Sequence, residues 1–337
     1  MQSAPLVSVI IVVWNSKAYL HTCLRKLATQ SFQDFEIILV DNGSSDGALD
    51  DLEGRYPSLS LKVERLDTNH GFAVANNIGA RLAQGQWLAL LNADAFPEPD
   101  WLEHLLEAAE EHQKYSFFSS RQIQANSPEL LDGAGDAYHI SGLAWRQHYN
   151  QPIHHFGSDS YEVFGACATA ALYSRNIFLK IGGFDEDYFS YFEDVDLSFR
   201  LRLAGEQCLY VPQAVVQHIG SASKGRVSDF VIYHGHRNLV WTYFKNMPGK
   251  LFWIYLPLHI IMNLYFMISF FLKGRGDAIL KAKVDAVRNL PKVLRKRKTV
   301  QQNSKATISE IYRVMERGLF TPVRVSIERR CFGNKLK

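Results

Sequence analysis

The sequence predicts an α/β protein built on a mostly parallel sheet with helices on both faces. Short runs of Val, Ile and Leu, each long enough for one strand, alternate with segments in which apolar residues recur at helical spacing. Polar clusters follow three of these runs directly, at 14–16, 41–47 and 92–96. Because ligands of such sheets bind at the carboxyl ends of the strands, these clusters are the first candidates for a site.

The first hundred residues are expected to fold in the order βαβαβαβ. Val7–Val13 is rich in Val and Ile and ends at Trp14-Asn15, as expected of a buried parallel strand. The segment 16–29 has apolar residues at helical spacing. The same criteria predict a strand at Phe35–Val40, a helix over 48–55, a strand over 60–65, a helix at Ala73–Gln84 and a strand at Trp87–Leu91.

The pattern changes after Pro97. A helix is expected over 99–112, and residues 121–161 are then polar, Gly-rich and aromatic with little periodicity. Such stretches form long loops or short strands and often carry substrate specificity. The remaining elements expected before residue 220 are a strand at Phe164–Tyr173, a helix at Ser174–Ile181 that ends in two glycines, a helix at Leu197–Ala204, and strands at Gln207–Val211 and Ala214–His218.

Composition narrows the class of protein. With 337 residues, 47% hydrophobic and 21% charged, the chain is globular and long enough for a large core or two domains. Its four cysteines are scattered without a Cys-x-x-Cys pair, which predicts free thiols in a reducing compartment and no zinc knuckle. The first apolar run is only strand-length and no basic segment precedes it, so no signal peptide is expected.

Charge is distributed unevenly along the chain. Residues 273–337 hold 18 Lys and Arg against 5 Asp and Glu, a net charge of +13, whereas residues 1–272 carry a net charge of −10. The sequence therefore predicts a basic tail on an acidic body. Anionic lipid, an anionic acceptor or nucleic acid could bind such a tail.

The most informative stretch is the acidic cluster Glu193, Asp194 and Asp196. Four aromatic residues precede it within 188–192, and an apparent helix follows. Apolar surroundings raise the pKa of a carboxyl group and suit it to act as a general base. The alternative is an acidic first helical turn that complements the helix dipole.

A second acidic position, Asp94, lies just past the end of a predicted strand. Mg²⁺ and Mn²⁺ prefer oxygen ligands and often share them with phosphate, so this carboxylate suits a metal that faces a diphosphate. The alternative is a turn residue that caps the next helix. His218 also ends a predicted strand. A neutral imidazole is a common metal ligand, although a lone histidine at a strand end is more often structural.

Two further segments could contact a nucleotide. Asp41 opens a turn-rich loop that runs to Gly47, and its carboxylate could accept a hydrogen bond from N3–H of a pyrimidine base. Turn chemistry alone would also explain most of this loop. Asn69–Gly79 opens a helix with small residues that would let a diphosphate or sugar approach the helix N-terminus. Tight helix packing would explain the same small residues.

Together, these segments resemble the inverting glycosyltransferases of family 2, whose GT-A fold is a Rossmann-like sheet flanked by helices. The matching segments, in the family's order, are Val7–Asn15, Asp41–Gly47, Asn69–Gly79, Leu90–Pro97, Gly182–Arg202 and His218, and the resemblance covers residues 5–245. The strings Asn69–Phe72, Leu91–Asp94 and Glu193–Leu197 are most similar to the bacterial rhamnosyltransferase-like branch. That branch uses dTDP-rhamnose and builds cell-surface polysaccharide or lipid-linked oligosaccharide.

The resemblance implies roles for individual residues. Asp41 resembles the Asp that binds the base, Asp94 the metal-binding Asp of the family's DXD element, and Asp194 the catalytic base. His218 resembles the His that can complete the site for Mg²⁺ or Mn²⁺. The first DXD position is Asn92 here, which implies a weaker hold on the metal and more dependence on the nucleotide diphosphate. The donor nucleotide is expected to contact Val13, Asn15, Asp41, Asn69, Gly71, Phe72, Asn77, Asn92 and Ala93. The acceptor is expected to contact Glu193, Asp196 and Trp145.

Leu251–Leu272 is a run of 22 residues without charge, between Lys250 and Lys273. A helix of that length is about 33 Å long and could cross the hydrocarbon core of a membrane. Nucleotide sugars are cytoplasmic and basic tails favour the cytoplasmic side, so body and tail belong on one side. We therefore expect a helix lying in the interface, or a re-entrant hairpin broken at Pro257, rather than a span. The alternative is a buried core helix. Residues 281–298 predict an amphipathic surface helix near anionic lipid.

The sequence thus predicts a catalytic domain over 1–245 and a membrane-associating helix with a basic helical tail over 246–337. The expected activity is transfer of L-rhamnose from dTDP-rhamnose, with inversion, onto a polyprenyl-diphosphate-linked or glycan acceptor at the cytoplasmic face of the bacterial inner membrane. Anionic membrane lipid is an expected partner, and nucleic acid is not. The rival hypothesis is an inactive relative that serves as a scaffold for polysaccharide assembly. The complete set of Asp41, Asp94 and Asp194 argues against it.

Overall fold

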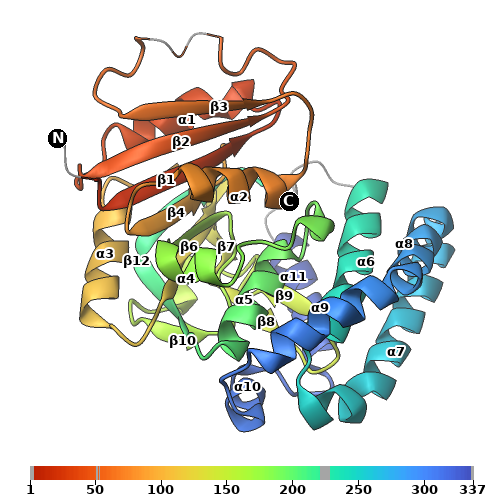
Figure 1. The fold of residues 1–337 in the computed structure, drawn as a ribbon. Coiled ribbons are helices and arrows are strands. Elements are labelled where there is room, and N and C mark those ends of the chain that lie inside the picture. The colour runs from red at the N-terminus through yellow and green to blue at the C-terminus, as the bar shows by residue number, and fades with distance from the viewer. Residues whose placement is uncertain (1–3, 51, 53, 221–227, 335–337) are drawn as a thin grey trace.

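A mixed sheet forms the centre of the molecule (Figure 1). The computed structural model describes residues 4–334 apart from 51, 53 and 221–227, and side chains as far as residue 328. Within these residues the sheet has ten strands; eight follow the order β10-β12-β6-β11-β4-β1-β2-β3, while β5 pairs with β12 and β7 with β6. The strands are β1 (Val7–Val13), β2 (Phe35–Asn42), β3 (Leu61–Leu66), β4 (Trp87–Leu91), β5 (Ala95–Pro97), β6 (Phe117–Gln124), β7 (Ser127–Gly133), β10 (Tyr161–Val163), β11 (Ala170–Ser174) and β12 (Cys208–His218).

The four strands β4, β1, β2 and β3 are parallel, as predicted. β1 and β2 are buried almost throughout, which explains why their sequences are largely apolar. One face of the sheet packs on α1 (Lys17–Leu27) and α3 (Trp101–Glu111). The other face packs on α2 (Phe72–Leu82), α4 (Arg175–Lys180) and α5 (Glu193–Leu203). The parallel arrangement brings the polar clusters after β1, β2 and β4 to one edge of the sheet.

The other half of the sheet mixes both directions. β11 is antiparallel to β4 and β6, whereas β12 is parallel to β6 and antiparallel to β5 and β10. The α/β class is therefore confirmed, but parallel pairing is confined to the N-terminal half and the β6–β12 pair. Long loops or short strands were predicted for the polar stretch 121–161, and it contains short strands. They include β8 (Asp136–Tyr138) and β9 (Ala144–Arg146), which form a two-stranded sheet.

Some predicted boundaries are wrong. α5 begins at Glu193 rather than Leu197, so the acidic cluster forms its first turn. The two strands expected over 207–218 are one strand, β12, with an irregularity between Val211 and Val215. A helix does not form over 48–55, where the described residues form turns; residues 51 and 53 lie outside the described residues.

Six helices follow the sheet in the described part of the chain: α6 (Asp229–Asn246), α7 (Gly249–Leu272), α8 (Gly276–Arg288), α9 (Leu290–Gln302), α10 (Ile308–Val314) and α11 (Thr321–Asn334). The segment 281–298 therefore spans two helices that meet at Asn289. Helices α6 to α9 lie together at one side of the molecule (Figure 1). Leu251 and Ile311 share an apolar core cluster with Tyr138 and Phe199, so this region is packed on the body and is not a free tail.

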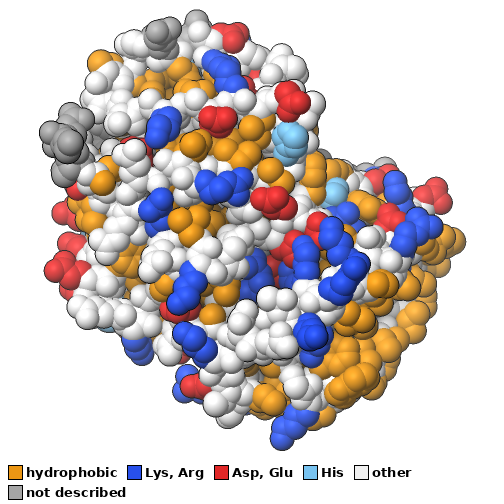
Figure 2. All heavy atoms as spheres, in the orientation of Figure 1, with side chains coloured by type: hydrophobic (Ala, Val, Ile, Leu, Met, Phe, Trp, Pro, Cys, Tyr) orange, Lys and Arg blue, Asp and Glu red, His pale blue; other side chains and the backbone are white. Residues whose placement is uncertain are grey.

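α7 carries the uncharged run and is long and apolar enough to cross a membrane, judged by length and composition. Only 17% of its most apolar stretch is buried, which disfavours the core-helix alternative. Its exposed side chains form what we call the apolar stripe: Trp253, Ile254, Ile260, Ile261, Leu264, Tyr265, Ile268, Phe271 and Leu272. These positions recur every three to four residues and therefore share one face of the helix. Hydrophobic side chains gather over α7 and its neighbour α8 at the molecular surface (Figure 2).

Candidate active site

A cavity of about 420 Å³ lies where the loop after β4 meets the start of α5. Its walls also include the end of β12 and part of the β8–β9 sheet, segments that are far apart in the sequence. Seven predicted site residues line it: Phe72, Asn92, Asp94, Trp145, Glu193, Asp194 and His218. The tertiary structure therefore gathers the predicted metal pair, the predicted base and two of the three predicted acceptor residues around one space.

Asp94 and His218 face each other in this cavity. They meet because β5 pairs with β12, which sets Ala95 opposite His218. Nε2 of His218 lies 3.4 Å from Oδ1 of Asp94, and Nδ1 lies 2.8 Å from Oδ2 of Asp132, which also pairs with Arg146. Burial lowers the pKa of His218, but the hydrogen bonds to Asp132 and Asp94 outweigh it and raise the pKa to about 9.

The donor set of Asp94 and His218 fits a divalent cation. A carboxylate oxygen and an imidazole nitrogen point at one another within a cavity that has room for further oxygen ligands. The hydrogen bond between Nδ1 of His218 and Asp132 directs Nε2 toward Asp94, an arrangement in which a carboxylate commonly supports a metal-binding histidine. Because His218 must lose a proton to bind a metal ion, protons and metal compete at this position.

Asp194 lies in the first turn of α5. Its carboxylate accepts hydrogen bonds from the backbone N–H groups of Ala168 (3.3 Å) and Val195 (2.8 Å). Burial raises the pKa of Asp194, and these hydrogen bonds only partly offset it. Its neighbour Glu193 is 6% exposed, and burial together with the charge of Asp194 holds its pKa well above the usual range. A partly buried carboxylate that faces a cavity and has a raised pKa suits a general base.

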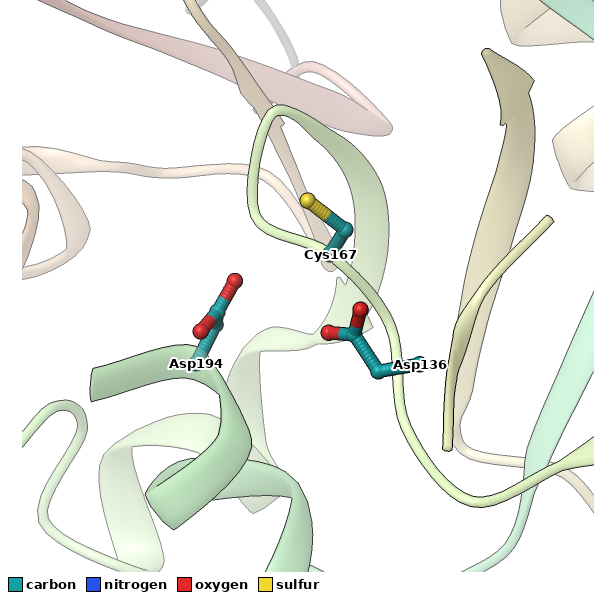
Figure 3. Close-up of side chains that lie close together, drawn as sticks. All are labelled: Asp136, Cys167 and Asp194. Carbon is teal, nitrogen blue, oxygen red and sulfur yellow. The ribbon is translucent and has the colours of Figure 1, made fainter. Parts of the chain in front are cut away.

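Asp194 also belongs to a cluster that the sequence did not predict (Figure 3). Potential ligand atoms of Asp136, Cys167 and Asp194 all lie within 4.8 Å of one another. Burial raises the pKa of the Cys167 thiol well above its usual value, so the sulfur is protonated and a poor ligand. Mg²⁺ and Mn²⁺ also prefer oxygen to sulfur. The cluster is better explained as the surroundings of a base than as a site for either ion.

The residues expected to bind the nucleobase lie at the ends of β1 and β2, outside this cavity. Asp41 is buried and accepts a hydrogen bond from the Ser44 N–H (3.0 Å), with Arg65 3.5 Å from its other oxygen. Oδ1 of Asn15 accepts a hydrogen bond from the Ser45 N–H (2.9 Å). The loops after β1 and β2 therefore contact each other at the predicted edge of the sheet.

Four other expected nucleotide contacts have structural roles. Oδ1 of Asn69 accepts a hydrogen bond from the Gly71 N–H (2.8 Å) in the turn before α2. A Cβ at Gly71 would lie 2.6 Å from the carbonyl oxygen of Phe189, so the glycine admits a loop of this chain. Tight packing was the alternative explanation for the small residues of this segment. Val13 and Ala93 are buried in the apolar core, which leaves only their backbone to face a ligand.

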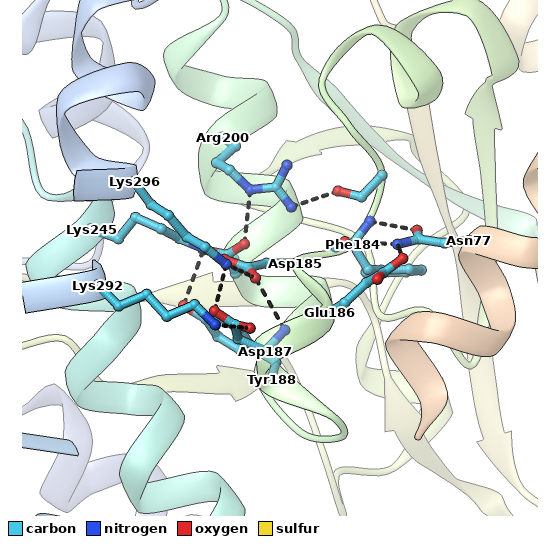
Figure 4. A network of polar contacts seen from close by, with 12 residues as sticks. Asn77, Phe184, Asp185, Glu186, Asp187, Tyr188, Arg200, Lys245, Lys292 and Lys296 are labelled. Atoms are coloured by element: carbon cyan, nitrogen blue, oxygen red, sulfur yellow. Dashed lines mark hydrogen bonds and ion pairs between the residues drawn. The ribbon is translucent and has the colours of Figure 1, made fainter. Parts of the chain in front are cut away.

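Two predicted contacts lie away from the cavity and bind other parts of the chain. Asn77 is buried; its amide donates to the carbonyl of Phe184 (2.9 Å), and its Oδ1 accepts from the N–H of the same residue (2.8 Å), so it ties α2 to the loop before α5 (Figure 4). It does not line the cavity. The carboxylate of Asp196 is fully buried between Arg200 (2.8 Å) and Lys245 (2.7 Å) and cannot contact an acceptor.

Part of the basic tail is neutralised within the molecule. Lys296 pairs with Asp185 (2.5 Å) and Asp187 (2.6 Å), and Lys292 pairs with Asp187 (2.6 Å) (Figure 4). Lys245 reaches the same acidic loop, 2.5 Å from Asp185. Burial raises the pKa of Asp185, but Lys245 and Lys296 outweigh it and hold the pKa well below its usual range. Lys292 and Lys296 fasten α9 to the body, which corrects the expectation of a basic tail whose charges are all available to lipid.

Sequence reasoning missed three residues at the cavity and its rim. Arg146 and Asp136 line the cavity, and Asp132 holds His218. All three come from the stretch that lacks periodicity, which offers no signal for which polar side chains turn inward. The adjacency of Arg146 to Trp145, already an expected acceptor contact, was the available hint.

Comparison with known proteins identifies the family. The model of glycosyl transferase family 2 matches residues 8–182, more than half of the chain. The chain belongs to this family. This family 2 glycosyltransferase is 29% identical over 246 residues to the N-acetylglucosaminyl-diphospho-decaprenol L-rhamnosyltransferase of Mycobacterium tuberculosis, covering 65% of this chain and 77% of that relative. It is 40% identical over 188 residues to a PGL/p-HBAD biosynthesis glycosyltransferase of Mycobacterium bovis, covering 55% and 66%.

Solved structures share the fold of this family 2 enzyme. S. aureus TarS 1–349 in complex with UDP aligns with a TM-score of 0.54 at 19% identity, over 91% of each chain. The mannosyltransferase PcManGT from Pyrobaculum calidifontis, in complex with GDP-Man and Mn²⁺, aligns with a TM-score of 0.56 at 16% identity, over 98% of this chain and 85% of that one. At such identities the likeness establishes the fold alone, and the expected GT-A fold is confirmed.

Proposed function

We propose that this glycosyltransferase moves L-rhamnose from dTDP-rhamnose, with inversion, onto a polyprenyl-diphosphate-linked or glycan acceptor. The observation that carries the proposal is one cavity that holds both a metal-type pair, Asp94 and His218, and a partly buried carboxylate in the first turn of a helix, Asp194. The name of a relative, which describes L-rhamnosyl transfer to a lipid diphosphate, supports the choice of sugar and acceptor.

In the proposed mechanism Asp194 is the general base. The acceptor hydroxyl gives its proton to Asp194 while its oxygen attacks the anomeric carbon, and the bond from that carbon to the diphosphate breaks on the opposite face. The raised pKa of this partly buried carboxylate favours this role near neutral pH. We propose that Trp145 and Glu193 contact the acceptor. Among the described residues, Oε2 of Glu193 has no hydrogen-bond partner, so an acceptor hydroxyl could supply one.

We propose that the donor lies along the carboxyl ends of β1, β2 and β4. Asp41 and Asn15 would hold the base, and Asn92 would face the diphosphate. Bound Mg²⁺ or Mn²⁺ would be held by Asp94 and His218 and would neutralise the charge that develops on the departing diphosphate. The convergence of those two side chains supports this assignment.

We also propose that the protein lies on the cytoplasmic face of the membrane through the apolar stripe of α7. The opposite side of this helix is fastened to the body, where Nδ1 of His259 donates to the Ser141 carbonyl (2.8 Å) and its ring stacks on Tyr243 at 4.0 Å. A helix held along the body favours an in-plane position over a span. Lys250 and Lys273 are exposed at its two ends, where anionic headgroups would meet them.

The Asp194→Asn substitution tests the assignment of the base, because it keeps the shape of the side chain and removes its basicity. We expect the transfer rate to fall by about 10²–10⁴-fold, with donor binding retained. Release of dTDP measures the rate, and calorimetry measures donor binding. Asp100→Asn changes an exposed carboxylate outside the cavity and serves as the matched control. Near-normal turnover of Asp194→Asn would reject the role of Asp194.

A thermal-shift panel of nucleotide sugars, with and without Mg²⁺ or Mn²⁺, tests the donor. We expect dTDP-rhamnose with metal to raise the melting temperature most, because only the true donor fills both the base and the sugar subsites. Stabilisation by another sugar nucleotide would reject rhamnose. Binding without nucleotide release, with every acceptor, would instead favour the scaffold hypothesis.

A further inference from the structure

The loop that leads into the catalytic helix has an unusual backbone. Phe189, Tyr191 and Phe192 have φ angles of 65°, 66° and 69°, a region that bulky side chains rarely adopt. The Tyr188 carbonyl accepts a hydrogen bond from the Ser190 N–H (2.8 Å), which closes a tight three-residue turn centred on Phe189. Such a conformation persists only where the surrounding structure holds it.

One buried side chain of α6 holds this loop. Asn238 is fully buried, and its amide nitrogen lies within hydrogen-bond distance of three backbone carbonyls of the loop, those of Tyr188 (3.0 Å), Ser190 (3.0 Å) and Tyr191 (2.7 Å), which share its two N–H donors. Its own Oδ1 accepts from Nε of Arg237 (2.9 Å), so the orientation of the amide is set. A single amide therefore fixes the directions of three carbonyls in the loop.

Arg237, the residue before Asn238 in α6, supports the same segment. Its guanidinium donates to the carbonyls of Asp187 (3.2 Å) and Tyr188 (3.0 Å). The guanidinium also lies 4.3 Å from the ring centre of Trp241, which holds the side chain against α6. Two adjacent residues of one helix thus bind the carbonyls on both sides of the turn.

The opposite side of the loop contacts the start of α2. The Phe189 carbonyl accepts a hydrogen bond from the Ala73 N–H (3.2 Å) in the first turn of α2. The ring of Phe189 lies over Gly71, where an added Cβ would clash with it. The loop therefore bridges α6 and α2, and Phe192 at its end is the residue from which α5 begins. Asp194 follows two residues later, so its position depends on this loop.

We propose that Asn238 is a positioning residue for the transfer reaction: it holds the loop 188–192 so that Asp194 and the loop residue Tyr191 face the cavity. Asn238 does not line the cavity itself and acts through the backbone carbonyls that it binds. The inference rests on the proposed role of Asp194 as the base. This role connects α6 with catalysis, a connection that the amino-acid sequence did not suggest.

Asn238→Asp tests the proposal, because the side chain keeps its size and loses both N–H donors. We expect kcat to fall on the order of 100-fold, as misplacing a reacting group by about 1 Å does, with the donor dissociation constant unchanged. Chymotrypsin cleaves after aromatic residues, so the loosened loop should also become a cleavage site at Tyr188, Phe189, Tyr191 or Phe192. If the Asp variant does not fold, Asn238→Ala is tested in its place, because it removes the N–H donors without adding a charge.

Asn289→Asp is the matched control. Its amide donates to one carbonyl, that of Asp285 (2.9 Å) at the end of α8, rather than to the loop, so kcat and the cleavage pattern should not change. Folded Asn238 variants with normal kcat and a protected loop would overturn the proposal. So would a loss of donor affinity as large as the loss of kcat. If Asp194→Asn remains active, the base assignment fails by itself, while chymotrypsin still reports whether Asn238 orders the loop.

Discussion

Replacing the buried Lys245 by Met should destabilise the protein more than replacing an exposed lysine does. The Lys245 side chain is 2% exposed, and its ammonium lies 2.5 Å from Asp185 and 2.7 Å from Asp196. Removing one partner of a buried ion pair costs about 3–5 kcal/mol, because it leaves an uncompensated charge. Asp185 keeps Lys296 and Asp196 keeps Arg200, so we expect the lower end, about 3 kcal/mol.

Urea unfolding at several pH values measures this loss. Burial raises the pKa of Asp185 and of Asp196, but Lys245 and the other cations outweigh it and hold both values below the usual range. A carboxyl group with a depressed pKa contributes stability that is present above its unfolded value, about 3.9, and is lost as the pH falls through its folded value. The difference between wild type and Lys245→Met should therefore be full at neutral pH and shrink below about pH 4.

Lys292→Met is the matched control for this prediction. Lys292 also pairs with an aspartate of the loop, at 2.6 Å, but its side chain is 54% exposed. Exposed pairs contribute about 0–1 kcal/mol, so the control should change little. Equal losses in the two variants, or a Lys245→Met loss that persists unchanged in acid, would refute the reasoning.

Three further predictions concern the metal pair and the membrane face. Asp132→Asn should weaken Mn²⁺ binding by about 10–100-fold in calorimetry, because it releases Nδ1 of His218; unchanged affinity would reject that support. Burial lowers the pKa of His218, but Asp132 and Asp94 outweigh it and raise the pKa to about 9. The protonated His218 therefore stabilises the metal-free fold fully below about pH 6.5, its unfolded value, and this contribution is lost as the pH rises through about 9. The urea stability of wild type should therefore exceed that of His218→Gln most below about pH 6.5, and a gap that widens toward pH 9 would contradict this sign. Replacing Trp253, Ile261 and Ile268 by Ser should abolish binding to anionic vesicles while turnover of a water-soluble acceptor persists, and Val63→Ser, an exposed apolar residue of β3, should leave vesicle binding unchanged.

Much of the fold could be predicted from the chain alone. The strands at Val7–Val13 and Trp87–Leu91 have the predicted bounds, because a buried parallel strand is an unbroken apolar run that its own residues specify. Asp94 and Asp194 could be selected as site residues because strand ends and helix starts are local features. The alternation of strands and helices also predicts that the polar loops lie at one edge of the sheet.

The partners of polar side chains could not be predicted in this way. Asp194 and Asp196 are two residues apart in one helical turn, yet the first faces a cavity and the second is buried between Arg200 and Lys245. Asp132 was not selected at all, although it binds His218.

The sequence by itself therefore determined the class of fold, the order of most of its elements and the loops that carry the site. Only the tertiary structure decided which carboxylates face the cavity, that α9 is fastened to the loop before α5, and that Asn238 holds the loop ahead of Asp194. The physical reason is that apolar periodicity is a property of neighbouring residues. The burial and pairing of a charge are set by groups that arrive from distant parts of the chain.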